Sequence, residues 1–257
     1  MSGVRDRSNE RLKPIDTLVW RMITLIGVGH VFKIADQVKG VILGEMPGAV
    51  CVELDPGRYY ALCHPEVQRQ GPLTYRLLSL FQKRLAKSFG GELGSEMLAA
   101  VEAANLLGVE SLMIDMDAKT MFDRVWREMP MKERFKLFFS AIIGMIASKK
   151  SVETELESFS ENEEAYLKEF GNQFPTLKRV LIDDRNQLMS ARIMEAEARF
   201  GNVVAVVGEG HIDGIRGLLG DRTVQLVRLK ELQNGEAGKR YTASKDGKEV
   251  MFTYQYQ

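Results

Sequence analysis

Short apolar runs, each followed by turn residues, are the feature that most constrains how this 257-residue chain can fold. The segment NVVAVV (Asn202 to Val207) is almost wholly apolar, and AVCVEL (Ala49 to Leu54) is a second run of the same kind. Strands of this composition are typical of parallel sheets, because helices cover both faces of such a sheet. The pattern therefore favours an α/β protein.

The N-terminal part of the chain has a strand–helix–strand order, which also indicates a parallel sheet. MITLI (Met22 to Ile26) predicts a strand, apolar residues between Val31 and Ile42 recur at helical spacing, and the strand that begins at Ala49 follows. Two more strands are predicted at Ser111–Ile114 and Val224–Leu229. We predict a mixed α/β (α+β) fold with a central, mostly parallel sheet built from two related halves.

Residues 1–257 are expected to form a single domain. Within it, residues 58–182 have a mainly helical pattern and predict an insertion, with one helix at Leu73–Leu85 and an acidic, solvated helix face at Ser151–Phe170. Asp183 and Asp184 are expected to open a helix that runs to Phe200, with both carboxylates near its positive end. Residues 230–257 predict a C-terminal edge β-hairpin.

Composition excludes several classes of function. Lys and Arg together number 35, as do Asp and Glu, so nothing favours nucleic acid as a partner. Two cysteines make neither a disulfide framework nor a cysteine-based zinc site, and the polar N-terminus has no signal-peptide core. The apolar stretch Leu137–Ala147 is about half of the roughly 20 residues that a spanning helix needs, so it predicts a buried, partner-covered or interfacial helix. We expect a cytoplasmic protein without a transmembrane segment.

An internal repeat is the most informative motif in the chain. LIGVGHVFKI (Leu25 to Ile34) and VVGEGHIDGI (Val206 to Ile215) share an apolar residue, Gly-x-Gly-His and then a β-branched residue. Two of the chain's three histidines, His30 and His211, occupy this context. Glycines in such a turn permit positive φ and close backbone approach, and the residue that follows lies where α/β proteins bind ligands. The turn glycines are Gly27, Gly29, Gly208 and Gly210.

Two simpler interpretations of the repeat compete with a shared functional site. A dinucleotide-binding turn would need a third glycine, whose place is taken by Val31-Phe32 in the first copy and Ile212-Asp213 in the second. A single histidine at a strand end is usually a hydrogen-bonded structural residue. Because two histidines occupy the same position of a repeated motif, we expect His30 and His211 to line one pocket.

Acidic residues follow the apolar runs at matching places, so several carboxylates are expected at the same sheet edge. These candidates are Glu53, Asp55, Asp115, Asp117 and Asp184. Two neutral imidazoles and a carboxylate can hold a divalent cation and leave one position open for water. Glu53 is the first choice as third metal ligand or general base, because alternation along the strand would point Asp55 elsewhere.

Arginines near the same strand ends could neutralise a developing oxyanion. The candidates are Arg58, Arg124 and Arg185, with Arg58 and Arg185 placed with Glu53 as catalytic residues. The expected cofactor is a divalent metal, Mn, Co or Zn, bound by His30, His211 and Glu53.

The motifs, taken in order, resemble the TraB/PrgY family, whose members are linked to shutdown of peptide-pheromone signalling. The resemblance runs from about Thr24 to Arg228. Besides the two Gly-x-x-His motifs, it rests on VELDPGR, LMIDMDAKTMFDRVW and LIDDRNQLMSARI, which begin at Val52, Leu112 and Leu181. The family is similar to Tiki proteases and, more distantly, to erythromycin esterase and ChaN-like proteins.

This resemblance implies a sheet core with a helical insertion and metal-dependent peptide cleavage that needs a glutamate. By position, the implied residues are Gly27, His30, Glu53, Gly208 and His211. The chain departs from relatives at Asp115-Met116, where Asp-Arg is common, so a cation is missing there unless Arg124 or Arg185 supplies it. Relatives also often carry transmembrane helices after the second motif, which this sequence lacks.

Three functions follow as hypotheses. The first is a metal-dependent, peptidase-like hydrolase acting on a peptide or a small amide or ester. The second is a non-catalytic protein of the pheromone-shutdown type that binds and sequesters a peptide. The third is a homodimeric scaffold joined through the apolar helix and the exposed edge of the hairpin.

Overall fold

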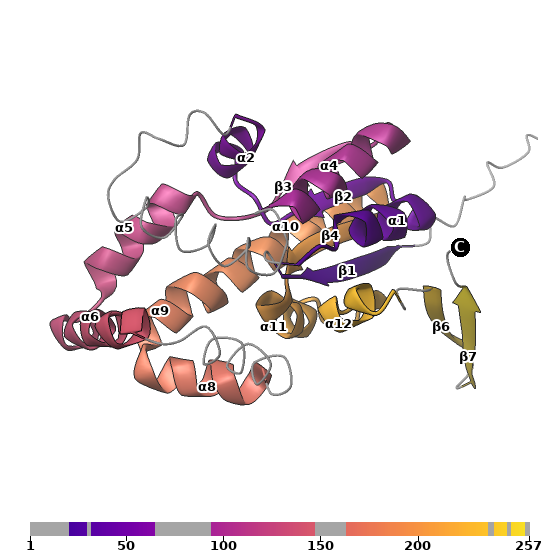
Figure 1. Cartoon of the computed structure of the whole chain (residues 1–257). Coiled ribbons are helices and arrows are strands. Elements are labelled where there is room, and N and C mark those ends of the chain that lie inside the picture. Colours follow the sequence, from indigo (N-terminus) through magenta and orange to yellow (C-terminus); the bar gives the residue numbers. More distant parts are fainter. Residues whose placement is uncertain are drawn as a thin grey trace, which may run out of the picture.

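A five-stranded, all-parallel sheet forms the centre of the computed structural model, which describes residues 21–29, 32–64, 94–146, 163–235, 239–245 and 248–254. The strand order is β3-β2-β4-β1-β5 (Figure 1). The predicted α/β class and parallel sheet are therefore confirmed. The strands are β1 (Met22–Val28), β2 (Ala49–Val52), β3 (Glu110–Met113), β4 (Asn202–Gly208) and β5 (Val224–Val227).

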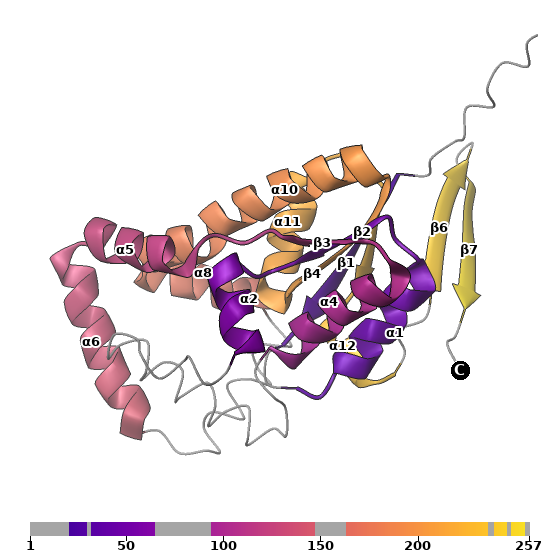
Figure 2. The ribbon, with the colours of Figure 1, turned by 90° about the horizontal axis from the view of Figure 1, so that it is seen from above.

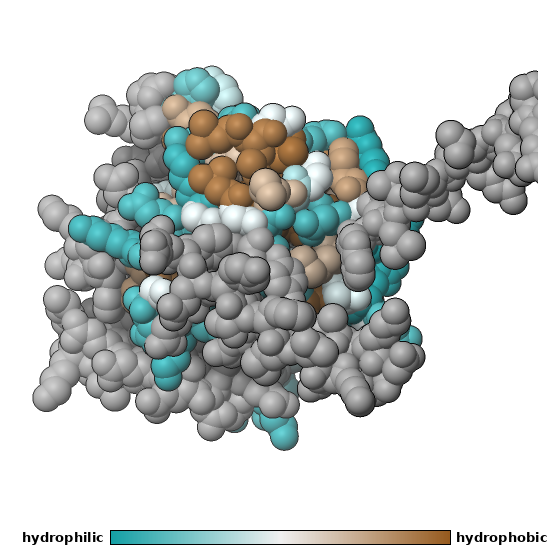
Figure 3. Space-filling model, turned by 90° about the vertical axis from the view of Figure 1, so that its right-hand side faces the viewer, coloured by the Kyte–Doolittle hydropathy of each residue, from teal (hydrophilic) through white to brown (hydrophobic). Residues whose placement is uncertain are grey.

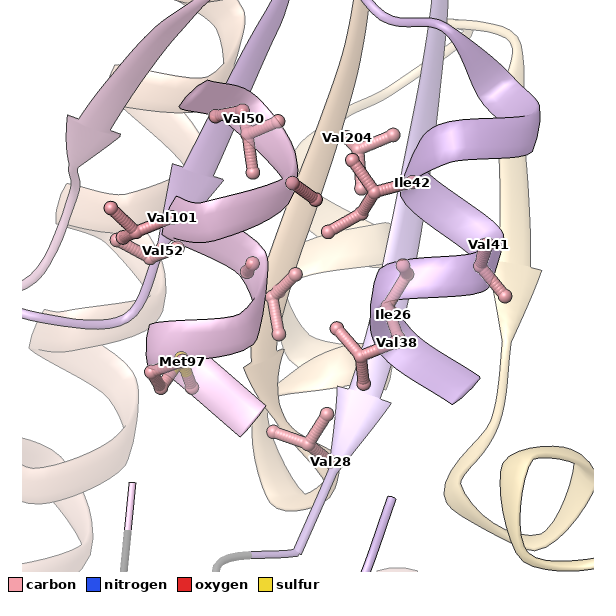
Figure 4. Packing of buried hydrophobic residues seen from close by; sticks show 14 of the residues in the cluster. Ile26, Val28, Val38, Val41, Ile42, Val50, Val52, Met97, Val101 and Val204 are labelled. Carbon is pink, nitrogen blue, oxygen red and sulfur yellow. The ribbon is translucent and has the colours of Figure 1, made fainter. Parts of the chain in front are cut away.

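Helices cover both faces of the sheet, as the apolar runs predict. On one face α1 (Ala35–Glu45) and α4 (Ser95–Leu107) lie side by side over alternate residues of β1, β2 and β4 (Figure 4). On the other face α10 (Asp184–Phe200) and α11 (Ile212–Leu218) pack on the intervening residues (Figure 2). Successive side chains of a strand point to opposite faces, so a strand buried on both sides is apolar throughout.

The segment between β2 and α10 contains a strand of the central sheet as well as helices. The helix α4 ends at Gly108, which adopts the left-handed conformation expected of such a stop, and β3 then pairs with β2 in parallel. The helix α4 and the strand β3 are thus part of the central layers. Farther from the sheet lie α2 (Pro56–Cys63), α5 (Ala118–Glu128), α6 (Met131–Ile146), α8 (Glu163–Gln173) and α9 (Pro175–Lys178).

The helix α10 begins at Asp184, directly after Asp183, and ends at Phe200, so the predicted helix is confirmed. A π-helical segment, Arg179–Asp183, joins α9 directly to α10, and Asp183 itself has helical φ and ψ. Val180 is fully buried in a small apolar cluster with residues of α5 and α9, which holds this segment in a helical conformation. Asp183 instead pairs with Lys178 at 2.6 Å.

The C-terminal hairpin consists of β6 (Lys239–Lys245) and β7 (Lys248–Tyr254), which pair antiparallel. It forms a sheet of its own and does not extend the five-stranded sheet. The short helix α12 (Leu229–Gln233) follows β5. The predicted helix Leu73–Leu85 and residues 151–162 of the acidic segment lie outside the described residues.

Figure 3 shows the side of the molecule where α1 and α4 end, and an apolar patch is visible on it. The exposed hydrophobic side chains at these two helix ends are Met46 and Leu106. Within the described part of the chain, no helix has both the length and the apolar character needed to cross a membrane.

Candidate functional site

The strand ends that carry the repeated motif lie next to each other at the carboxyl edge of the sheet. Val28 of β1 pairs with Gly208 of β4, and Val52 at the end of β2 pairs with Val206. The residues that follow these strands therefore meet at one edge, where α/β proteins place their ligands. His30 lies outside the described residues, although Gly29 directly before it is described.

Glu53 follows β2 directly and is 5% exposed. Its Oε2 atom accepts a hydrogen bond of 2.5 Å from the backbone N–H of Gly208, and its Oε1 atom accepts one from Arg185 Nη2. The Glu53 backbone N–H donates to Val206 O at 3.0 Å, which extends the ladder between β2 and β4 by one residue. The neighbouring strand and a guanidinium group thus fix both carboxylate oxygens.

His211 lies in the short 3₁₀ helix Glu209–His211 after β4 and is also 5% exposed. Its Nδ1 atom is 2.7 Å from Asn186 Oδ1, and its Nε2 atom is 3.6 Å from Glu53 Oε1. The structure therefore brings together the predicted residues Glu53 and His211. Asn186 was not predicted, although it directly follows Arg185 in the LIDDRN segment.

Arg185 lies between Glu53 and Asp115 with only 11% of its side chain exposed. It makes a bidentate contact with Asp115, Nε to Oδ1 at 2.9 Å and Nη2 to Oδ2 at 2.7 Å, and its Nη1 atom donates to Leu181 O at 3.1 Å. Burial alone would lower the pKa of Arg185, but the charges of Glu53 and Asp115 and the hydrogen bonds to them outweigh this and raise it. Arg185 is therefore a fixed cation that holds Glu53 in place.

Asp115 joins a second arginine to the same network. Arg58 donates through Nη2 to Asp115 and through Nε to Asp55 at 2.6 Å, while Asp55 also caps α2. The pKa of Arg58 is raised because these carboxylates outweigh its burial. The expectation that Asp55 points away from the site is wrong on two grounds: residues two apart in a strand point to the same face, and β2 already ends at Val52, so Asp55 lies in the turn before α2.

The cation expected to be missing after Asp115 is supplied by other parts of the chain. Arg58 and Arg185 both contact the Asp115 carboxylate, and Arg192 Nη1 donates to its backbone oxygen at 2.8 Å. Of the two substitutes suggested by the sequence, Arg185 therefore contacts Asp115, whereas Arg124 makes other ion pairs.

Three predicted candidates have partners outside this network. Arg124 pairs with Asp184 at 2.6 Å, which joins α5 to the start of α10, and with Glu128 at 3.4 Å within α5. Asp117 is exposed and caps α5 through Thr120, whose backbone and side-chain hydrogen bonds lower the pKa of Asp117. These side chains stabilise the helical segment.

None of the four turn glycines has a positive φ, so their role is close approach. A Cβ on Gly27 would overlap the carboxylate of Glu209, and one on Gly208 would lie 3.3 Å from Glu53 Oε2. A Cβ on Gly29 would crowd Phe32 and Leu229, and Gly210 lies inside the 3₁₀ helix.

Glu209 is a further acidic residue at this edge that the sequence did not single out. Its Oε1 atom accepts from Arg228 Nε at 2.6 Å, and its Oε2 atom accepts from the backbone N–H of Leu229 at 2.9 Å. Arg228 also pairs with Asp213. The only signal in the sequence was the position of Glu209 inside the second motif.

The donor set at His211 and Glu53 fits a divalent cation in two respects. Ligands about 2.1 Å from a tetrahedral ion lie roughly 3.4 Å apart, and His211 Nε2 and Glu53 Oε1 are 3.6 Å apart. Each ligand also has the outer partner that metal ligands usually have, Asn186 for the imidazole and Arg185 for the carboxylate. Within the described residues no group of three or more His, Cys, Asp and Glu side chains could hold an ion, so a third ligand would have to come from elsewhere.

Comparison with known proteins places the chain in a family. Residues 20–221 match the model of the TraB/PrgY/gumN family. An uncharacterized protein of Methanocaldococcus jannaschii is 32% identical over 227 residues, which cover 83% of this chain and 54% of the relative. The chain thus spans about half the length of that relative. On this evidence the chain belongs to the TraB/PrgY/gumN family.

Proposed function

We propose that this protein is a metal-dependent hydrolase whose centre is formed by His211 and Glu53. The observation that carries the proposal is the pair of buried donors 3.6 Å apart, His211 Nε2 and Glu53 Oε1, at the carboxyl edge of the sheet. A second residue fixes each donor side chain through a hydrogen bond: Asn186 for His211 and Arg185 for Glu53. Such outer partners orient metal ligands and raise their basicity.

His30 is the proposed third ligand. It follows β1 by two residues, and β1 ends beside the strand that leads to His211. Mn, Co and Zn all accept a set of two imidazoles and one carboxylate. A divalent cation bound there would polarise a substrate carbonyl and lower the pKa of a water molecule to about 7.

The chain's own residues have separate roles in this proposal. Glu53 is both a ligand and the base that accepts a proton from the attacking water. Arg58 is better suited than Arg185 to stabilise a developing oxyanion, because its side chain is 34% exposed and its Nη1 atom has no hydrogen-bond partner among the described residues. Arg185 is buried and bonded to carboxylates, so it fixes the position of Glu53. The proposed substrate is a peptide or a small amide or ester.

The metal content of purified protein tests the proposal directly. After loading with Mn²⁺, Co²⁺ or Zn²⁺ and desalting, we expect about one equivalent in the unmodified chain and much less in His211→Ala, His30→Ala and Glu53→Gln. His64→Ala is the matched control, because His64 is half-buried and stacks on Tyr60, and among the described residues its Nδ1 atom has a hydrogen bond with Tyr60 O. Equal metal content in all five proteins would refute the metal site.

Hydrolysis is tested separately with a library of peptide, amide and ester substrates analysed by mass spectrometry. Turnover should require added metal and should be lost in Glu53→Gln, whereas Arg58→Met should lower kcat more than it raises KM. A missing oxyanion partner typically costs about 10²- to 10³-fold in kcat. Metal-loaded protein that leaves every substrate intact would refute the hydrolase.

Peptide binding without cleavage is a second candidate, favoured by exposed aromatic side chains in the helical segment. Trp126 on α5 and Phe135 and Phe138 on α6 are 49%, 59% and 62% exposed. Large apolar side chains at the surface often mark an interaction site. Calorimetry with an apolar peptide, followed by mass spectrometry of the same sample, separates the two functions: tight binding with intact peptide supports sequestration.

A further inference from the structure

Four large hydrophobic side chains are exposed in the outer part of the helical segment, away from the central sheet. They are Trp126 on α5 and Met131, Phe135 and Phe138 on α6, and their exposed fractions lie between 49% and 62%. Figures 1 and 2 both show α6 at the outer end of this segment. We call these four residues the apolar ridge.

The α6 part of the apolar ridge projects outward from the protein. Met131, Phe135 and Phe138 are four and three residues apart, so they lie along one side of the helix. Successive residues of an α-helix are rotated by about 100°, which places Phe135 nearly opposite Glu133. Glu133 is buried and accepts hydrogen bonds from two backbone N–H groups in the first turn of α9. The opposite side of α6 therefore packs on the protein, and the ridge faces outward.

Arg134 joins the α5 and α6 parts of the ridge. Its guanidinium lies 5.8 Å from the centre of the Trp126 ring, and its Nη1 atom is 3.8 Å from Met131 Sδ. Its Nε atom donates to Met129 O at 3.0 Å, which fixes the side chain at the junction of the two helices. The contact of a guanidinium with an aromatic ring is itself favourable. Trp126 is thus held beside the α6 residues, with a cation between them.

The charges next to the ridge are positive. Besides Arg134, the cations between residues 126 and 138 are Arg127, Lys132 and Lys136, all of them exposed. The same stretch has only two acidic residues. Glu133 is buried, and Glu128 is bonded to Arg179 and Arg124. The exposed surface therefore combines large apolar side chains with positive charge.

This combination argues against a second copy of the chain as the occupant. In a two-fold symmetric dimer the same surface faces itself, so the cations of one copy would meet the cations of the other. The area is also small for that purpose. Four side chains exposed by about half present roughly 400 Å² of apolar surface, whereas each partner of a stable complex usually buries about 800 Å².

The shape and the charge both fit a lipid surface. A bound peptide usually lies in a groove or along a sheet edge, whereas an outward ridge enters a membrane interface. Aromatic side chains settle at the level of the lipid headgroups, and Trp is favoured there. Lysines and arginines beside them are attracted to anionic lipids, and each contributes about a fivefold gain in binding.

We propose that the apolar ridge is a docking surface for an anionic lipid membrane. Trp126, Phe135 and Phe138 enter the headgroup region, and the neighbouring cations contact the lipid phosphates. The helix α6 lies in the plane of the interface and does not cross the bilayer. This contact goes beyond the proposed function and does not depend on it, because the ridge shares no residue with the proposed metal site.

Sedimentation of the full chain with lipid vesicles tests the proposal. The protein should bind vesicles of equal parts phosphatidylglycerol and phosphatidylcholine, and should bind pure phosphatidylcholine at least about 10-fold more weakly. Raising the salt concentration should weaken binding to the anionic vesicles. The chain has two tryptophans, so Trp20→Phe leaves Trp126 as the only reporter, and its fluorescence should shift to the blue when vesicles are added.

Two charge variants with the same change in net charge separate a local effect from a general one. Arg127→Glu combined with Lys132→Glu should weaken binding to the anionic vesicles by at least about 20-fold. Arg199→Glu combined with Lys230→Glu changes two exposed cations on α10 and α12 and should weaken it far less. Circular dichroism confirms that each variant is folded.

Two apolar variants test insertion in the same way. Met131→Ser combined with Phe135→Ser should weaken binding by about 10-fold or more and reduce the blue shift of Trp126, because less apolar surface leaves water. Leu106→Ser combined with Leu218→Ser removes two exposed apolar side chains on other helices and is the matched control. Both control variants should bind like the unmodified chain to within a few fold.

Three results would overturn the proposal. The first is no binding to anionic vesicles at low salt, and the second is binding that the ridge variants and their controls weaken equally. The third is a dimer that forms without lipid and is lost in the Met131→Ser, Phe135→Ser variant, as measured by analytical ultracentrifugation. In that case a second copy of the chain occupies the ridge. The metal content of the same variants should equal that of the unmodified chain, so the two proposals fail or stand separately.

Discussion

Arg185→Met removes the cation that lies between two buried carboxylates and keeps an unbranched side chain of similar reach. In the intact chain Arg185 makes a bidentate contact with Asp115 at 2.7 and 2.9 Å and a further contact with Glu53. The exposed fractions of the three side chains are 11%, 0% and 5% for Arg185, Asp115 and Glu53. Water therefore cannot replace the lost partner without a local rearrangement.

The expected cost follows from the charges that remain. One pair of unit charges about 4 Å apart contributes roughly 4 kcal/mol at an effective dielectric constant of 20, and the desolvation of Arg185 offsets part of this gain. Removing one partner of a buried ion pair typically destabilises a protein by about 3–5 kcal/mol, because the other charge stays buried and uncompensated. Arg58 still neutralises part of Asp115, so we expect the lower half of this range.

Urea unfolding followed by circular dichroism measures the cost, with Arg192→Met as the matched control. Arg192 lies on the same helix, and its guanidinium donates to the backbone oxygen of Asp115, so its loss should cost only about 1–2 kcal/mol.

A double substitution distinguishes charge from packing. Arg185→Met combined with Asp115→Asn should be less destabilised than the sum of the single changes, with a coupling of about 1–3 kcal/mol. If Arg185→Met costs no more than Arg192→Met and shows no coupling to Asp115→Asn, the buried ion network does not hold the site together and the reasoning fails.

Three further predictions concern residues outside this network. Gly27→Ala should lower the free energy of unfolding by about 1–3 kcal/mol, because the new Cβ overlaps the carboxylate of Glu209; thermal unfolding measures this change. Burial raises the pKa of Cys51 to about 12, so at pH 8 a thiol reagent should modify only the exposed Cys63 until the protein is unfolded. Asp117→Ala should lower the free energy of unfolding by about 1 kcal/mol, because it removes the cap of α5. Since the pKa of Asp117 is lowered in the folded state, this difference between the two proteins should be present at neutral pH. It should disappear as acid protonates Asp117.

The strands of the central sheet were predictable because their burial leaves a local signature in the sequence. AVCV and NVVAVV are apolar at every strand position or nearly so, and the structure packs their alternate residues against helices on opposite faces. The start of α10 at Asp184 was predictable from the two aspartates, but the helical segment that precedes it was not. Two adjacent aspartates resemble the first turn of a helix, but the burial of Val180 by residues distant in sequence extends the helical conformation through them.

The position of Glu53 was predictable for a different reason: it directly follows a strand, and the carboxyl edge of a parallel sheet is a known place for ligands. The sequence could not show which of the candidate arginines lies between Glu53 and Asp115. Arg124 and Arg185 are both near candidate acids along the chain, and only the direction of α10 across the sheet edge brings Arg185 between Glu53 and Asp115. Asn186 was missed because its contact with His211 joins two separate elements that pack together only in the folded chain.

The folded chain also explains why both copies of the motif begin with glycine. Glu53 follows β2 and reaches Gly208 at the end of β4, and Glu209 follows β4 and reaches Gly27 at the end of β1. The glutamate that follows β2 therefore contacts the end of β4, and the glutamate that follows β4 contacts the end of β1. Each glutamate is in turn held by an arginine, Arg185 in the first case and Arg228 in the second. It follows that a change at Glu209 should disturb the strand that leads to His30 more than it disturbs the contact between His211 and Glu53.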